Sequence, residues 1–150
     1  MRVVIQRVSK ASVSIEGQPI ASIGAGLLVL VGIDNKDVEA DIEYLVKKIT
    51  NLRIFDDEKG VMNLSVLNVS GEILCVSQFT LLASTGKGNR PSYIRAAEPF
   101  FAAQKYNEFC GEMEKVLKKK IPTGQFGANM QVELINDGPV TIIIDSKNRG

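Results

Sequence analysis

The sequence predicts a single α+β domain, built on a curved, mostly antiparallel sheet or β-barrel with two main helices. The chain has 150 residues, the length of one ordinary domain. Apolar residues recur with the period of strands near both ends and with the period of helices in two stretches between them. The expected order is β-β-β-α-β-α-β-β, with the helices grouped rather than strictly alternating with strands.

The first third of the chain is expected to form three strands. Apolar and polar residues largely alternate over residues 2–15, as in a half-buried strand. A turn at residues 16–19 lets residues 20–23 pair back as a hairpin. After a glycine-rich break at residues 24–26, residues 27–33 are apolar on both faces. That pattern indicates a central strand.

Two amphipathic helices are expected in the middle of the chain. Asp37 is predicted to cap the first, whose apolar stripe is Ile42, Leu45, Val46, Ile49 and Leu52. The second begins near Glu98 with Pro99 in its first turn, and ends at three lysines, residues 118–120, where the helix dipole favours positive charge. Its predicted buried face is Ala102, Tyr106, Phe109, Met113, Val116 and Leu117.

The remaining segments complete the predicted sheet. Residues 55–60 form a polar turn, residues 72–81 a second long strand, and residues 83–90 a loop. Two further strands are expected at residues 129–135 and 140–145, joined by a turn.

Composition restricts the chemistry. The chain has no histidine, which removes the commonest general base, the Ser-His and Cys-His pairs and the usual zinc ligands. Cys75 and Cys110 have apolar neighbours and no CxxC spacing, so we expect buried, reduced thiols. No apolar run approaches the ~18 residues of a membrane span. A cytoplasmic enzyme or binding protein is therefore expected, with no membrane partner.

The net charge of +1 hides an uneven distribution. Residues 34–58 hold eight acids against four bases, a balance of −4, and residues 87–149 hold ten bases against seven acids, a balance of +3. Lys87, Arg90, Arg95 and the lysines near residue 120 are predicted to make a basic face. The alternative is ordinary solvated surface charge.

Three segments have residue types suited to chemistry. Ser77, Gln78 and Thr80 end an apolar strand, where they could bind a carbonyl or oxyanion, or simply mark its polar end. Residues 136–141 contain a Gly-Pro pair, which a plain hairpin turn also explains. The glycines and bases of residues 85–92 lack Walker A spacing, so RNA phosphate is the milder alternative.

Four segments, in the same order along essentially the whole chain, together resemble the D-aminoacyl-tRNA deacylases. They are Arg-Val-Val-Ile-Gln-Arg-Val at residues 2–8, Ser-Gln-Phe-Thr-Leu at 77–81, Lys-Gly-Asn-Arg-Pro-Ser at 87–92, and Gly-Ala-Asn-Met at 127–130 running into Asn-Asp-Gly-Pro-Val-Thr at 136–141. The resemblance implies a homodimeric hydrolase without metal or other cofactor. It would cleave the ester between a D-amino acid and the 3′-terminal adenosine of tRNA, a proofreading reaction in translation.

The resemblance also implies residue roles. Gly138 and Pro139 would form a cis peptide that one subunit inserts into the pocket of the other, rejecting L-aminoacyl groups but not glycyl-tRNA. The reaction centre would comprise Ser77, Gln78, Phe79 and Thr80. Phe126 and Met130 would flank the terminal adenine, and Arg7 would orient the Gly-Pro carbonyls.

Two points stay open. Thr80 as nucleophile and the substrate's ribose 2′-hydroxyl as the group assisting water are both considered for this family, and the lack of histidine favours the second. The rival functions are a non-catalytic RNA-binding module and a metal-dependent hydrolase with an all-carboxylate or cysteine site.

Overall fold

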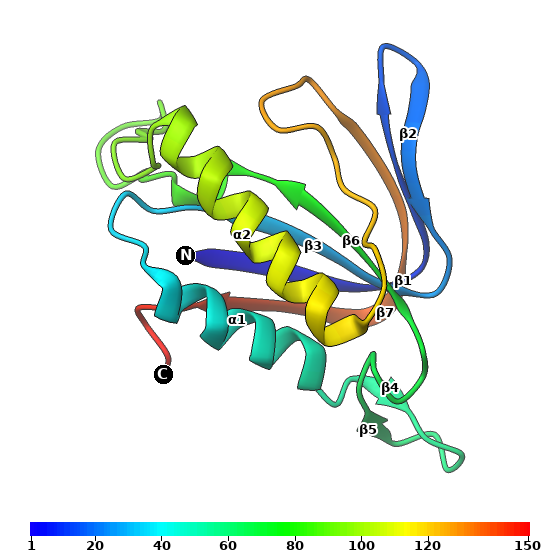
Figure 1. The fold of residues 1–150 in the computed structure, drawn as a ribbon. Coiled ribbons are helices and arrows are strands. Elements are labelled where there is room, and N and C mark those ends of the chain that lie inside the picture. The colour runs from blue at the N-terminus through cyan, green and yellow to red at the C-terminus, as the bar shows by residue number, and fades with distance from the viewer.

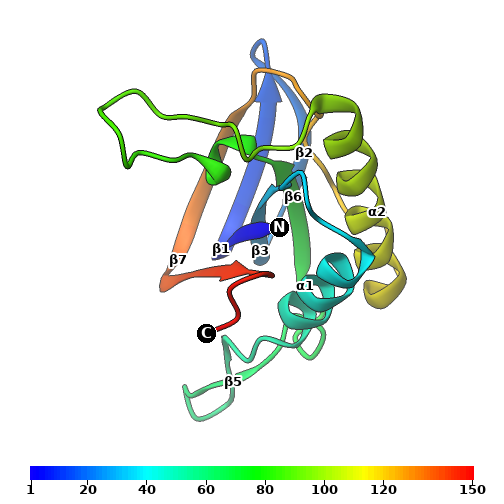
Figure 2. The ribbon, with the colours of Figure 1, turned by 90° about the vertical axis from the view of Figure 1, so that its left-hand side faces the viewer.

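A computed structural model describes residues 1–150 as a curled five-stranded sheet with two helices packed on one side (Figures 1 and 2). The strands of this sheet are β1 (Arg2–Ile15), β2 (Gln18–Ile23), β3 (Gly26–Gly32), β6 (Glu72–Ser77) and β7 (Gln131–Asp145). The helices are α1 (Glu39–Asn51) and α2 (Pro99–Leu117), with a short 3-10 helix, η1 (Phe79–Leu82), after β6.

The long strand β1 organises the sheet. It pairs antiparallel with β3 through its first half and with β2 through its second half, and β7 pairs with it from the other side along its length. The pairing of β3 with β6 is parallel. The sheet is therefore mostly antiparallel and curved, as the sequence predicts.

Both faces of β3 and β6 are buried, which confirms the central position predicted for the apolar run. Leu27 and Val29 pack under the helices, against Ile42 and Phe109. Leu28, on the opposite face, lies in a smaller apolar cluster inside the curl of the sheet. The same alternation continues in β6, so the end of β6 is held firmly from both sides.

Asp37 does not cap the first helix, so that prediction was wrong. The helix is preceded by Val38, whose backbone N–H donates to the Asp41 carboxylate at 2.8 Å. Asp37 is buried and accepts hydrogen bonds from the Met1 amino group and, at 2.7 Å, from the backbone N–H of Asp34. It fastens the first strand to the helix, a long-range role that a local pattern does not reveal.

Two predicted strand boundaries were also wrong. The strand predicted over residues 72–81 ends at Ser77, where β3 stops offering partners. The two predicted strands form one strand, β7, which begins at Gln131 rather than at residue 129, because β1 pairs with both halves and shifts of register on either side of the Val8–Asn136 pair absorb the residues between them.

Smaller differences concern surface segments. The polar turn at residues 55–60 lies in a short hairpin of β4 (Phe55–Asp56) and β5 (Met62–Leu64). Val116, predicted to be buried, is exposed in the last turn of α2, which ends at Leu117 before a left-handed Lys118.

The remaining composition-based expectation concerns the cysteines. Cys75 and Cys110 are free and buried, as predicted. Hydrogen bonding to Cys110 and burial together raise the pKa of Cys75 well above its ordinary value. No helix has the length and apolar character needed to cross a membrane.

Candidate active site

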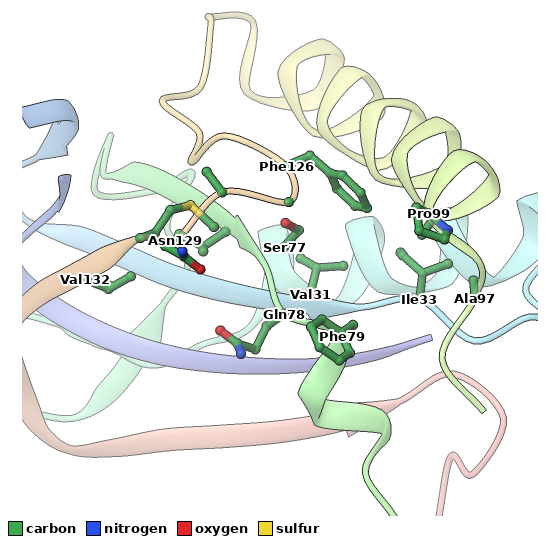
Figure 3. Close-up of a pocket in the computed structure, with 15 residues that line it drawn as sticks. Val31, Ile33, Ser77, Gln78, Phe79, Ala97, Pro99, Phe126, Asn129 and Val132 are labelled. Atoms are coloured by element: carbon green, nitrogen blue, oxygen red, sulfur yellow. The ribbon is translucent and has the colours of Figure 1, made fainter. Parts of the chain in front are cut away.

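A cavity of about 560 Å³ lies between the end of β6, the start of α2 and the segment before β7 (Figure 3). Its walls are mostly hydrophobic, and none of the side chains that line it is ionisable. Five of the predicted site residues line this cavity: Ser77, Gln78, Phe79, Phe126 and Met130. Thr80, Arg7, Gly138 and Pro139 do not.

The parallel pairing of β3 and β6 places Ser77 at the cavity. Ser77 lies opposite Val31, and the next backbone N–H, that of Gln78, donates to the Val31 carbonyl at 2.7 Å. The chain then turns into η1, with the Leu81 N–H donating to the Gln78 carbonyl at 3.2 Å. Ser77 is half-buried, and its side chain faces the cavity (Figure 3).

Gly32 permits this turn to sit against β3. A Cβ atom on Gly32 would lie 2.4 Å from Cδ2 of Leu82 and 3.0 Å from the Gln78 carbonyl oxygen. Leu82 is buried, so it has little room to move away. The position of η1, and of every group it presents, therefore depends on the absence of a side chain at residue 32.

The start of η1 presents backbone N–H groups. Phe79 and Thr80 open the short helix, and such first N–H groups have no acceptor inside a helix. The Thr80 hydroxyl oxygen accepts a hydrogen bond from Gln78 Nε2 at 2.5 Å. Thr80 faces a second, open depression beside Arg2 and Asp145 rather than the cavity. The Thr80 hydroxyl oxygen is thus held by Gln78, and the first N–H groups of η1 have no acceptor within this short helix.

The segment that carries Phe126 is anchored to β6 at Cys75. The Cys75 N–H donates to the Pro122 carbonyl at 3.2 Å, and the Cys75 carbonyl accepts from the N–H of Gly124 at 2.9 Å. The same carbonyl accepts from the Tyr106 hydroxyl at 3.0 Å, and burial raises the pKa of Tyr106 far above its ordinary value, so this donor stays protonated. The Tyr106 and Phe126 rings are 6.1 Å apart.

Gly124 leaves space for Met130. A Cβ atom on Gly124 would lie 2.5 Å from the sulfur of Met130. Phe126 and Met130 both line the cavity and give its wall an apolar, polarisable character. With no ionisable group on the cavity walls, this protomer supplies there the Ser77 hydroxyl and the dipoles of the backbone and of the Gln78 and Asn129 amides.

Gly138 and Pro139 lie in the middle of β7, joined by a cis peptide bond. Both are exposed and lie outside the cavity of their own protomer. Arg7, which is buried, donates from Nη1 to the Ile54 carbonyl at 2.7 Å and from Nε to the Asp137 carbonyl at 3.0 Å. Arg7 therefore fixes the backbone immediately before Gly138.

The basic residues of the predicted face lie at the two ends of α2. Lys87, Arg90 and Arg95 precede α2, whereas the lysines at 118–120 follow it. The helix has 19 residues, which at 1.5 Å per residue separates its ends by about 28 Å. Arg95 is paired with Asp34 at 2.9 Å.

No cluster of three or more His, Cys, Asp or Glu side chains that could hold a metal ion occurs in the structure. Sequence reasoning missed Gly32 and Asn129; Asn129 brings an amide to the cavity wall. A glycine within an apolar strand pattern signals close approach of another segment, so Gly32 was recognisable in principle. Asn129 lies in the Gly-Ala-Asn-Met segment quoted above, which could have drawn attention to it.

Comparison with known proteins gives a consistent result. The family described as D-Tyr-tRNA(Tyr) deacylase matches residues 4–145. Proteins named D-aminoacyl-tRNA deacylase from Bacteroides thetaiotaomicron and Parabacteroides distasonis are 62% and 63% identical over 149 residues, covering 99% of both chains.

Two solved structures share the fold. One, named "c-Myc DNA Unwinding Element Binding Protein", has a TM-score of 0.92 at 45% identity and covers 97% of this chain and 98% of its own. The other, described as "Structural Analysis of a probable eukaryotic D-amino acid tRNA deacylase", has a TM-score of 0.82 at 16% identity, with 95% and 97% covered. The second supports the fold alone.

Proposed function

The chain belongs to the D-Tyr-tRNA(Tyr) deacylase family, and we propose that it hydrolyses the ester between a D-amino acid and the terminal adenosine of tRNA, releasing both. The observation that carries this proposal is the cavity itself. It combines a slot for a base, backbone donors at η1 and walls without an ionisable side chain. Such a site suits an ester, which is already activated, better than an amide.

Each part of the cavity takes one part of the substrate. Phe126 and Met130 hold the adenine. Backbone N–H groups at the start of η1, beginning with that of Phe79, polarise the ester carbonyl and stabilise the oxyanion that forms when water adds. The ribose 2′-hydroxyl assists that water, the bond from the carbonyl carbon to the ribose oxygen breaks, and that oxygen receives a proton. Ser77 and Gln78 position the reacting groups.

The chirality gate is assigned to a second copy of the chain. Gly138 and Pro139 are exposed and remote from their own cavity, and β7 also exposes Ile135 and Ile143, which suits burial against another protomer. Their carbonyls would face the Cα substituents and exclude an L side chain. A main-chain gate ignores the identity of the D side chain, and glycine, which has none, passes it. Arg7 supports the gate through the Asp137 carbonyl.

A direct comparison of substrates tests this proposal. In the cytoplasmic setting proposed here, D-tyrosyl-tRNA and glycyl-tRNA should be deacylated far faster than L-tyrosyl-tRNA, with a strong chelator present. Equal rates on D- and L-tyrosyl-tRNA contradict the gate. Loss of activity with the chelator revives the metal-dependent hydrolase.

The proposed assembly has its own test. Sedimentation at working concentration should give the mass of a homodimer, and dilution to monomer should abolish turnover. An active monomer contradicts the cross-subunit gate.

The second candidate is nucleic-acid binding without turnover, which the similarity to a 45% identical protein named for binding a DNA unwinding element favours. It predicts that the protein binds tRNA but releases no amino acid from any D-aminoacyl ester. Detectable release at substoichiometric enzyme excludes it as the sole function.

A further inference from the structure

Exposed aromatic and apolar side chains gather at one end of the cavity. Phe79 is 57% exposed, Tyr93 39%, Ile94 83% and Phe100 81%. The rings of Phe79 and Tyr93 meet edge to face, with centroids 5.1 Å apart and an interplanar angle of 73°. Phe79 itself lines the cavity, and Phe100 follows Pro99, another cavity residue (Figure 3). This surface, here called the aromatic shelf, is therefore continuous with the cavity mouth.

A projecting arm adjoins the aromatic shelf. Residues 83–92 extend away from the sheet and helices (Figure 2), closed at their base by hydrogen bonds of 2.8 and 2.9 Å between the backbones of Ser84 and Ser92. The chain after the arm is fastened to the residue that follows β3, since the Ala97 N–H donates to the Ile33 carbonyl at 2.9 Å. The ion pair between Arg95 and Asp34 fastens this segment further. A projecting arm on a fixed base can hold a ligand against the shelf.

All charged side chains of this region are basic. Residues 78–97 contain Lys87, Arg90 and Arg95 and no aspartate or glutamate. Arg95 is neutralised by Asp34, but Lys87 and Arg90 are exposed and take part in none of the ion pairs of the structure. Two unpaired cations on the arm, with exposed aromatic rings at its base, suit a ligand that carries both phosphates and flat bases.

We propose that the shelf and arm bind the single-stranded nucleotides that precede the terminal adenosine of tRNA. Tyr93 and Phe79 stack against bases, and Lys87 and Arg90 contact phosphates. The assignment rests on the proposed function, because an adenosine held at Phe126 leaves the rest of its strand at the cavity mouth. Charge distinguishes this ligand from a D-amino acid side chain, which needs no cation.

The test compares two substrates that share the reacting ester. One is D-tyrosyl-tRNA, and the other is the D-tyrosyl ester of adenosine, which lacks the preceding nucleotides. The variants are Lys87→Ala with Arg90→Ala, and Tyr93→Ala. The matched control is Lys47→Ala with Lys59→Ala, which removes the same charge from exposed positions on α1 and in the β4–β5 turn.

Both shelf and arm variants should raise KM for D-tyrosyl-tRNA about tenfold and leave kcat/KM for the adenosine ester within about twofold. The double charge variant should also reduce the slope of log KM against log salt by about 1.4, the loss of two phosphate contacts to a single strand. The control should match the wild type on both substrates.

Three results overturn the inference: unchanged KM for D-tyrosyl-tRNA, an equal loss on both substrates, or a loss that follows dissociation to monomer in sedimentation. The last two indicate a catalytic or an assembly role instead. If the wild type hydrolyses neither substrate, the proposed function itself is refuted. If the wild type is active and one of the three results is obtained, only the binding role proposed for the shelf and arm is refuted.

Discussion

The cavity and the Gly138–Pro139 segment are held by opposite kinds of interaction. The cavity is formed by apolar side chains and backbone hydrogen bonds, and no ionisable side chain lines it. The backbone before Gly138 is held by a buried arginine, Arg7, which bonds two carbonyls and lies 3.2 Å from the Asp137 carboxylate. Charge therefore orients the backbone at Gly138, outside the cavity, whereas the cavity walls offer only uncharged groups.

This division has a physical reason. A buried charge needs fixed partners, and those partners hold it and the attached backbone in one geometry. Uncharged walls need no counter-ion when the cavity is empty, which suits a cavity proposed to admit a base and an ester. Four substitutions test whether charged contacts hold the backbone at Gly138 while uncharged groups form the cavity.

The largest effect on activity is expected for Gly32→Ala. The added Cβ would overlap Leu82 and press on the Gln78 carbonyl, moving η1 and its donors. A displacement of that order lowers kcat/KM by about 100-fold or more, with a cost of about 1–3 kcal/mol in the free energy of unfolding. Deacylation kinetics measure the loss in kcat/KM, and denaturant unfolding measures the loss in the free energy of unfolding.

Gly111→Ala is the matched control, because a Cβ on this residue of α2 meets no atom within 4 Å. It should leave activity unchanged and raise stability by up to about 1 kcal/mol. If Gly32→Ala behaves like this control, η1 does not depend on close approach.

Arg7→Lys addresses the charged region. A lysine lacks the planar fork with which Arg7 reaches the Ile54 and Asp137 carbonyls from two nitrogens, so these hydrogen bonds are weakened or lost. We expect a loss of about 2 kcal/mol in stability. The ratio of D- to L-tyrosyl-tRNA rates should fall by about tenfold, while kcat on the D substrate changes less.

The exposed Arg53, which contacts Asn63, provides the control variant Arg53→Lys. It should keep both stability and selectivity. An Arg7→Lys protein with unchanged selectivity would remove Arg7 from the support of the gate.

Thr80→Ala should have a smaller effect, below about tenfold in kcat. Its hydroxyl accepts from Gln78 and faces away from the cavity, so it positions the turn rather than attacking the ester. Single-turnover hydrolysis of D-tyrosyl-tRNA measures this. A loss of several orders of magnitude would restore the nucleophile hypothesis.

The smallest expected effect is on the pH dependence of stability at the ion pair of Asp41 and Lys147, which lies outside both regions. Burial tends to raise the pKa of Asp41, but hydrogen bonds from Lys147, Val38 and Ser146 outweigh it and lower that pKa to about 2. A lowered pKa in the folded state stabilises the fold above the ordinary value of 3.8, and this contribution is lost as pH falls toward 2. We expect about 1 kcal/mol, since Lys147 is partly exposed.

Unfolding of Lys147→Ala and the wild type between pH 2 and 6 measures that contribution. The two should differ near pH 6 and converge near pH 2. A constant difference across this range would show that Lys147 acts by packing instead.

Sequence patterns predicted the elements whose burial repeats regularly along the chain. The apolar run of β3 and the helix stripe at Ile42, Leu45 and Ile49 are examples, because a local period reports which faces are covered. The end of β6 was missed because Ser77 and the residues after it still alternate like a strand. Only the end of β3, a tertiary neighbour, stops the pairing.

The candidate site shows the same limit. Resemblance singled out Ser77, Phe126 and Met130, and the structure brings them to one cavity. The anchors behind them were not predictable locally. Tyr106 reaches Cys75 across 31 positions of the chain, and Asp37 reaches Met1 across 36.

The central claim, that the reaction proceeds without an ionisable protein group, is tested most directly on the substrate. Deacylation of D-tyrosyl-tRNA ending in 2′-deoxyadenosine should be slower than that of the ribose form by about 100-fold or more, because the assisting hydroxyl is gone. Equal rates on the two would contradict the claim and require a catalytic side chain that the cavity does not contain.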